Sequence, residues 1–292
     1  MAYLLKRLVT EPRLRVLMWA SLVSQILIVV TGAGVRLTGS GLGCPTWPLC
    51  TSDSLVNVPE MGIHGVIEFG NRLLTFVLLL IALLALVAAI VLGKERKLRS
   101  TSGWLIFGIL LQAVVGGISV LANLNPWVVG LHFVISGFMI ALASLQLWRT
   151  YQPTISAYAR VEKFLARALL ISGSITVFIG VVVTGSGPHA GDADTPRNGL
   201  DPELWQHFHS YPGYVTLAIS VCLLFLIRRR DVDGYAGRLV FWSTLCLLAQ
   251  AATGVAQSRL GLPVGIVVVH IILASAFISL MAFIQLAYGK RK

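Results

Sequence analysis

The sequence predicts an all-α integral membrane protein whose eight transmembrane helices form two four-helix bundles. Hydrophobic residues make up 56% of the chain and charged residues 12%, which is about half the charged fraction of a soluble domain. Eight apolar runs are long enough to cross a bilayer core, which requires about 20 residues. The two halves of the chain also repeat one another, so we expect one bundle over residues 1–153 and another over residues 154–292.

The predicted spans are apolar runs separated by short polar or basic segments. They lie near residues 16–35, 70–93, 103–122, 127–148, 165–184, 211–227, 239–257 and 264–288. We expect the first run to stay in the mature protein, because it is too long for a cleaved signal peptide. In addition, no small-residue cleavage site precedes the polar segment that follows it.

The basic residues indicate how these spans are oriented. The formal net charge is +11, and all but four of the 23 Lys and Arg residues fall on one side of an eight-helix arrangement. The four on the other side are Arg36, Arg72, Arg197 and Arg259. By the positive-inside rule both termini are cytoplasmic, and the loops 36–63 and 185–210 face outward from the plasma membrane. The basic excess is therefore a topology signal in a lipid bilayer and not a nucleic-acid footprint.

The internal repeat is visible in matched polar and small residues. Three pairs are each separated by 138 residues: Gln112 and Gln250, Gly116 and Gly254, His132 and His270. A V-T-G-x-G motif also occurs in each half, with Gly32 answering Gly185. Because each half contributes four spans, the two bundles have the same orientation and are parallel repeats. The two glutamines are typical of hydrogen bonds between transmembrane helices.

The stretch Ile63 to Thr75 opens the second span with ionisable side chains, which are costly at membrane depth and indicate function by default. On a helix, His64, Glu68 and Asn71 share one face within roughly 10 Å of axial length. This face is a candidate reaction or ligand surface. The competing interpretation is that His64 and Arg72 are interfacial anchors at the entrance of a span.

The same 138-residue separation pairs Asn71 with His209 and Glu68 with Gln206. The second half therefore has a histidine on its second span and another, His270, on its fourth. Two histidines that face each other across a four-helix bundle can hold a haem iron axially. The alternative is a pair of hydrogen-bonded core histidines. His207 would point away from this site on a regular helix.

Two of the four cysteines, Cys44 and Cys50, lie in the first outward loop, in the segment G-L-G-C-P-T-W-P-L-C. An oxidising environment and a separation of six residues permit a disulfide. A metal pair is the alternative. Cys222 and Cys246 lie inside spans and are typical of small apolar packing residues. His189, in the second outward loop, is expected to be an exposed loop histidine.

Together these motifs resemble the haem A synthase (CtaA) family, membrane enzymes that oxidise the C8 methyl group of haem O to a formyl group. The resemblance is carried by the loop G-S-G-L-G-C-P-T-W-P-L-C, by I-E-F-G-N-R at the second span and by G-L-H-F at the fourth, and it covers essentially the whole chain. The segment T-G-S-G-P-H-A-G-D also resembles the second outer loop of actinobacterial members.

The resemblance implies roles for individual residues. Glu68 matches the catalytic carboxylate of the family, and His132 matches the histidine that binds the substrate haem. His209 and His270 match the axial ligands of a haem b cofactor, through which electrons leave. Arg36 and Arg72 are candidates for pairing with haem propionates, with a simple surface role as the alternative.

One position departs from the family pattern. The family has E-x-x-H-R, whereas this chain has Asn71 where the histidine belongs. The substrate haem would then be held by His132 with Asn71, Arg72 and His64 nearby. His64 lies two turns before Asn71, and this distance of about 10 Å is too far for it to take over at the same ring height.

Two other functions compete with this interpretation. A di-haem electron-transfer cytochrome would require a complete histidine pair in each half, and Asn71 breaks that symmetry. A transporter would require broken helices at matched positions, which do not stand out. The expected partners are haem O as substrate, with haem O synthase, cytochrome c oxidase assembly factors and an unspecified electron acceptor.

Overall fold

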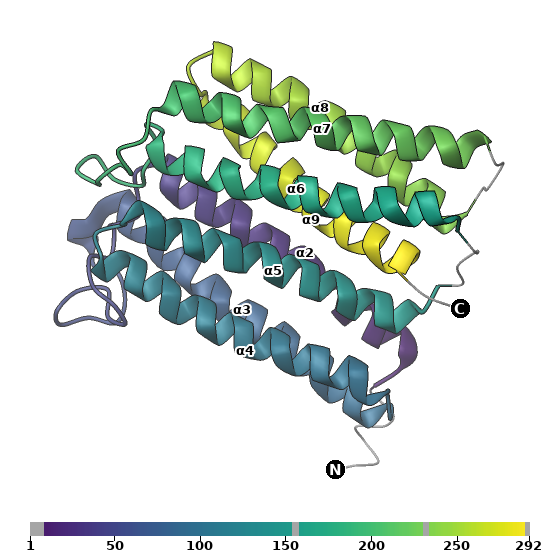
Figure 1. Ribbon diagram of the computed structural model, residues 1–292. Helices are drawn as coiled ribbons and strands as arrows, with labels where there is room; N and C mark the ends of the chain where they lie inside the picture. Colours follow the sequence, from purple (N-terminus) through teal and green to yellow (C-terminus); the bar gives the residue numbers. More distant parts are fainter. Residues whose placement is uncertain (1–8, 154–157, 230–233, 290–292) are drawn as a thin grey trace. The chain divides into compact units, whose positions relative to one another are not determined.

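The computed structural model describes residues 9–153, 158–229 and 234–289, and these residues fold into eight long helices and one short 3-10 turn (Figure 1). The elements are α2 (Glu11–Leu37), η1 (Pro59–Met61), α3 (Gly62–Val91), α4 (Arg96–Leu121), α5 (Pro126–Tyr151), α6 (Arg160–Ser186), α7 (Pro202–Arg229), α8 (Tyr235–Arg259) and α9 (Val264–Gly289). All eight helices are long and apolar enough to cross a membrane. The predicted all-α class and the eight spans are confirmed, while both chain ends, predicted to be cytoplasmic, lie outside the described residues.

Several helices begin well before their apolar runs, and proline lies in the first turn of α2, α5 and α7. Helix α7 begins at Pro202, whose missing N–H is not needed in a first turn. The Asp201 carboxylate accepts hydrogen bonds from the backbone N–H groups of Glu203 at 2.8 Å and Leu204 at 3.3 Å. Helix α3 begins at Gly62. Both histidine-bearing polar segments are therefore helical, which places their side chains on defined helix faces.

The described residues form two compact units. The first unit contains α2 to α5 together with residues 184–199, which are the end of α6 and the loop after it, and the second contains most of α6 with α7, α8 and α9. This segment joins the first unit through hydrogen bonds from the Arg36 guanidinium to the Thr184 carbonyl and from the Gly41 N–H to the Gly191 carbonyl. The predicted bundles of residues 1–153 and 154–292 stay a prediction, and the assignment of residues 184–199 to the first unit was not predicted from the sequence.

The two units differ in how their first helix packs. In the first unit, α2 packs closely along α3 and α5, and α4 does the same, so the four helices close into a ring. In the second unit, α8 packs closely along α7 and α9, but α6 does not approach either of these neighbours as closely over the described residues. The second bundle therefore has a wider separation beside α6.

The basic end of the first unit is held together by polar contacts between neighbouring helices. The Lys94 ammonium group lies 2.5 Å from the Glu11 carboxylate, and the Arg149 guanidinium donates to the Lys97 carbonyl at 2.8 Å. The ends that the charge pattern placed on one side are thus adjacent. Along the helices, large apolar side chains such as Phe138, which is 70% exposed, point outward. Such an apolar exterior suits a lipid environment.

Candidate functional site

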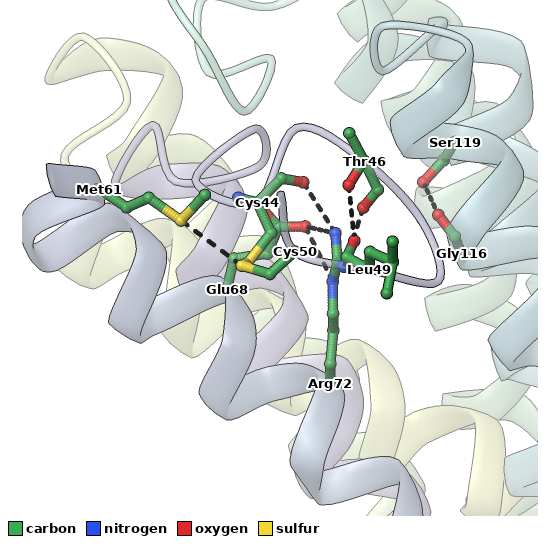
Figure 2. A network of polar contacts seen from close by, with 9 residues as sticks. All are labelled: Cys44, Thr46, Leu49, Cys50, Met61, Glu68, Arg72, Gly116 and Ser119. Carbon is green, nitrogen blue, oxygen red and sulfur yellow. Dashed lines mark hydrogen bonds and ion pairs between the residues drawn. A yellow bond between two sulfur atoms is a disulfide. The ribbon is translucent and has the colours of Figure 1, made fainter. Parts of the chain in front are cut away.

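Glu68 lies in the second turn of α3 and is buried, with 5% of its surface exposed. One carboxylate oxygen accepts the backbone N–H of Cys44 at 2.6 Å, and the other accepts the Arg72 guanidinium at 2.5 Å (Figure 2). Both partners can only donate, so the arrangement suits an ionised, acceptor-only carboxylate. The buried charge is compensated by an arginine one turn further along the same helix.

Arg72 anchors the first outer loop (Figure 2). Besides its two bonds to Glu68, it donates to the backbone carbonyls of Cys44 at 2.8 Å, Thr46 at 3.0 Å and Leu49 at 3.2 Å. A guanidinium group has five N–H donors, and these five bonds use all of them. Arg72 thus has no donor left for a haem propionate in this arrangement, which differs from the propionate role considered from the sequence.

The predicted disulfide between Cys44 and Cys50 is present, with a Cα–Cα distance of 4.5 Å, and both residues are fully buried. This finding removes the alternative of a metal-binding cysteine pair. The loop also reaches α4, because a Cβ atom added at Gly117 would lie 2.2 Å from the Trp47 ring. The disulfide loop is therefore fixed to α3 by polar contacts and to α4 by packing of an aromatic ring on a glycine.

His64 and Asn71 share the Glu68 face of α3, as the spacing predicted, but each has its own partner. His64 Nδ1 lies 2.9 Å from the hydroxyl of Ser40, a residue that is fully buried. Asn71 Oδ1 accepts the Thr31 hydroxyl of α2 at 2.8 Å. Along α3, Glu68 therefore lies between His64, which contacts the loop after α2, and Asn71, which contacts α2. His64 is held in the first turn of α3, where its side chain is exposed.

His132 projects from α5 toward α4 in the first unit. A Cβ atom added at Gly116 would lie 3.2 Å from His132 Cε1, so the imidazole packs directly on this glycine. Its Nδ1 atom is buried and has no hydrogen-bond partner. The Gln112 amide donates to the His132 carbonyl at 3.1 Å and to the Ser136 hydroxyl, which ties the two helices together at this level and agrees with the interhelical role predicted for Gln112.

His209 and His270 face each other in the second unit, with ring centroids 6.3 Å apart and planes inclined by 69°. Two iron–nitrogen bonds of about 2 Å, plus about 1.1 Å from each nitrogen to its ring centre, would give a span of about 6.2 Å, close to the observed separation. His209 Nδ1 lies 2.9 Å from the Thr176 carbonyl, and His270 Nδ1 lies 3.1 Å from the Thr253 hydroxyl. The pair therefore fits axial ligation of a haem iron through both Nε2 atoms.

A glycine on the neighbouring helix makes room for each of these imidazoles. Gly180 takes this place beside His209 and Gly254 beside His270. The repeat already matched Gly116 with Gly254, but it did not indicate a packing role. In the first helix of each half, the V-T-G-x-G motif does not align equivalent positions. Gly32 lies near Asn71, and the glycine that lies against its counterpart His209 is Gly180, not Gly185.

The remaining histidine of α7, His207, is exposed, as its position two residues from His209 predicted. Its ring stacks on Tyr211, with centroids 6.4 Å apart. Gln206, the counterpart of Glu68, accepts a hydrogen bond from the Ser258 hydroxyl at 2.8 Å. The second unit thus has a neutral contact between helices where the first has a buried carboxylate.

A sequence model of the cytochrome oxidase assembly protein family (COX15-CtaA) matches residues 15–282. The chain belongs to this family. A haem A synthase of Listeria welshimeri is 25% identical over 290 residues, which cover 93% of this chain and 94% of the relative. A haem A synthase of Listeria monocytogenes is 24% identical over 291 residues, with 93% and 94% coverage.

A haem A synthase of Staphylococcus epidermidis is 28% identical over 221 residues, which cover 68% of this chain and 71% of the relative. The family resemblance predicted from the sequence is confirmed for this cytochrome oxidase assembly protein. Its likeness to actinobacterial members stays a prediction. The family match spans both units, so it includes the Glu68 loop site and both histidine sites.

Proposed function

We propose that the protein is a haem A synthase, which oxidises the C8 methyl group of haem O to the formyl group of haem A for terminal oxidase assembly. Membership of the cytochrome oxidase assembly protein family and the names of the similar curated proteins support this function. The structural observation that carries the proposal is the difference between the two units at matched positions. At the positions of His209 and His270 in the second unit, which face each other, the first unit has Asn71 and His132, and the carboxylate of Glu68 is buried one turn before Asn71.

The second unit is proposed to hold the haem b cofactor, with His209 and His270 as its axial ligands. Their 6.3 Å centroid separation and the wider spacing of α6 support a ring between the helices. When bound, haem b supplies one-electron redox chemistry. The chain contributes two imidazoles whose Nδ1 atoms are held by hydrogen bonds, so each Nε2 would be available to bind the iron.

The first unit is proposed to bind the substrate haem O, with His132 as the protein ligand of its iron. Asn71 occupies the place of His209 in the repeat, and an amide is a poor iron ligand but a good hydrogen-bond partner. Asn71 and His64 would therefore line the site without binding iron. Arg72 would serve by holding the disulfide loop of Cys44 and Cys50 in place beside Glu68.

Glu68 is the proposed catalytic residue. Its bonds to the Cys44 N–H and to Arg72 favour the ionised form, and they fix the position of both oxygens. An ionised carboxylate beside the reacting methyl group could take a proton from water, or it could stabilise positive charge that develops on the ring. Both roles require the charge, and neither can be performed by Gln206 in the second unit.

The cellular setting belongs to the same proposal. We place the protein in the plasma membrane with both termini cytoplasmic, because nearly all basic residues lie on one side of the spans. Haem O synthase and cytochrome c oxidase assembly factors would be its neighbours, and an external acceptor would take the electrons.

A direct test is to purify the protein from cells that make haem O and to separate the extracted b, o and a haems. A haem A synthase should contain haem b together with haem O or haem A, and it should form haem A in the same cells. A di-haem electron-transfer cytochrome, the competing function, would contain haem b in both units and would form no haem A. A transporter is less well supported, since α7 continues through Pro212 without a break.

A further inference from the structure

We propose that Thr253 is a positioning residue that holds His270 as a firm iron ligand, and that its counterpart Val115 leaves His132 unanchored so that the first unit can release its haem. The inference rests on the proposed function and deepens it. It concerns how one repeated fold makes one haem resident and the other exchangeable, through a hydroxyl that is present in one half only.

Thr253 lies next to Gly254 on α8, and its hydroxyl contacts His270 Nδ1 at 3.1 Å. The same hydroxyl is 2.9 Å from the Ala249 carbonyl, one turn earlier on the helix. The hydroxyl also lies 3.2 Å from the Gln250 carbonyl, so its one hydrogen is directed to the helix carbonyls and its oxygen is left to accept from His270. The Gln250 carbonyl, which can only accept, is a second hydrogen-bond partner of His270. The proton therefore lies on Nδ1, and the Nε2 lone pair is free for iron.

The first unit repeats this arrangement without the hydroxyl. A Cβ atom added at Gly116 would lie 3.2 Å from His132 Cε1 and 3.8 Å from Nδ1, and the corresponding distances at Gly254 to His270 are 3.4 and 3.9 Å. The two imidazoles thus lie on equivalent glycines in nearly the same way. The residue before the glycine is Thr253 in one half and the buried Val115 in the other.

The consequence for His132 is visible in its hydrogen bonding. Its Nδ1 atom is buried without a partner, whereas both histidines of the second unit have a partner for Nδ1. A partner that accepts the Nδ1 proton fixes the tautomer and raises the basicity of the other nitrogen. His132 lacks both effects. It should be the weaker ligand, which suits a site that takes up a substrate haem and gives up a product haem.

The test compares Thr253→Val with Thr253→Ser in the purified full chain. Valine keeps the shape of the side chain and removes the hydroxyl, while serine restores it. We expect haem b transfer to apomyoglobin to be about 10- to 100-fold faster in Thr253→Val and near native in Thr253→Ser. The reduction potential should rise in Thr253→Val only, because a less basic ligand stabilises ferric iron less. Thr244→Val is the matched control, since Thr244 donates to a helix carbonyl on α8 in the same way and contacts Ser220 instead of a histidine.

The reciprocal variant Val115→Thr should place a hydroxyl beside His132 Nδ1 and slow transfer of haem O or haem A from the first unit by a similar factor. Equal transfer rates and potentials in native protein, Thr253→Val and Thr253→Ser would overturn the inference, as would an equal change in Thr244→Val. Failure of the proposed function would look different, because the native protein would then form no haem A, whatever the transfer rates and potentials of the Thr253 variants.

Discussion

Arg72 and Glu68 form an ion pair of 2.5 Å on one face of α3, and the same guanidinium binds three carbonyl groups of the disulfide loop. Arg72 therefore does more than compensate the charge of a buried carboxylate. It joins the proposed catalytic carboxylate to the loop segment that runs from Cys44 to Cys50, so that neither can move independently of the other.

Replacement of Arg72 should disconnect this loop and leave a buried carboxylate without its cation. We expect Arg72→Gln to destabilise the loop and its contacts by about 3 kcal/mol and to reduce haem A formation strongly. Arg72→Lys should recover only part of the activity, because an ammonium group cannot reproduce the five donors of the planar fork. Limited proteolysis within residues 44–54, compared with an assay of haem A, measures both effects. A fully active Arg72→Gln variant with an intact loop would refute this role.

The charge of Glu68 should matter more than its shape. Glu68→Gln keeps the size of the side chain and removes the negative charge, and we expect it to abolish haem A formation. The haem b spectrum of the second unit should stay native in this variant. Gln206→Glu offers a comparison, since a carboxylate in the second unit should not create a second active site. Normal haem A levels in Glu68→Gln would remove Glu68 from the proposed mechanism.

The disulfide should be intact in protein isolated from the membrane and should stabilise the loop. Mass spectrometry of unreduced peptides should find Cys44 and Cys50 in one linked species. Closing a loop of this length lowers the conformational entropy of the unfolded chain, which stabilises the folded loop by about 2 kcal/mol at room temperature. Cys44→Ser with Cys50→Ser should therefore loosen the loop less than Arg72→Gln does. Two free thiols in native protein, with full activity, would instead indicate a redox role for the pair.

The second-unit ligands should act as a pair. Loss of either His209 or His270 removes one axial bond from a different helix, so each alanine variant should lose the low-spin haem b spectrum or most of the haem. His207→Ala is the control on α7, because that ring is exposed and stacks on Tyr211. If both His209→Ala and His270→Ala retain full haem b with an unchanged spectrum, the haem b site lies elsewhere.

Features that depend on the length and spacing of segments could be predicted from the sequence, whereas contacts between residues that are distant in the chain could not. The eight helices could be predicted because apolar length alone decides whether a segment can span a bilayer. The shared face of His64, Glu68 and Asn71 could be predicted because a helix repeats every 3.6 residues. The disulfide between Cys44 and Cys50 could be predicted from a short spacing in an outward loop.

The partners of these residues could not be predicted in the same way. The carbonyl groups that bind Arg72 belong to an irregular loop. Every residue has such a carbonyl, so the sequence does not show which of them will accept a hydrogen bond. Gly180 escaped the comparison because the first helix of each half has a different register from the rest of the repeat. Thr253 did leave a signal, since it differs from Val115 at a matched position, but its meaning required the distance to His270.

Asn71 is the residue on which the two units differ most, and it decides how the substrate haem is held. Its amide accepts the Thr31 hydroxyl at 2.8 Å and lies beside Gly32, while its counterpart His209 lies beside Gly180. The glycine that makes room for an imidazole is thus retained in the first unit, although the imidazole is absent. This agreement suggests that Asn71→His would be accommodated without a change in helix packing.

We expect Asn71→His to supply a second axial ligand opposite His132 and to convert the substrate haem to a low-spin species that is retained during purification. Release of haem A should then be slower, because two iron bonds must break instead of one. His64→Ala should leave the spectrum and activity unchanged if His64 serves only to hold Ser40 at the outer end of α3. His132→Ala should abolish binding of the substrate haem both in the otherwise native protein and in combination with Asn71→His. Optical and electron paramagnetic resonance spectra of the three variants test these expectations together. An unchanged spin state in Asn71→His, combined with loss of activity in His64→Ala, would mean that the ring lies nearer the outer surface and that His64, not the position of Asn71, faces the iron.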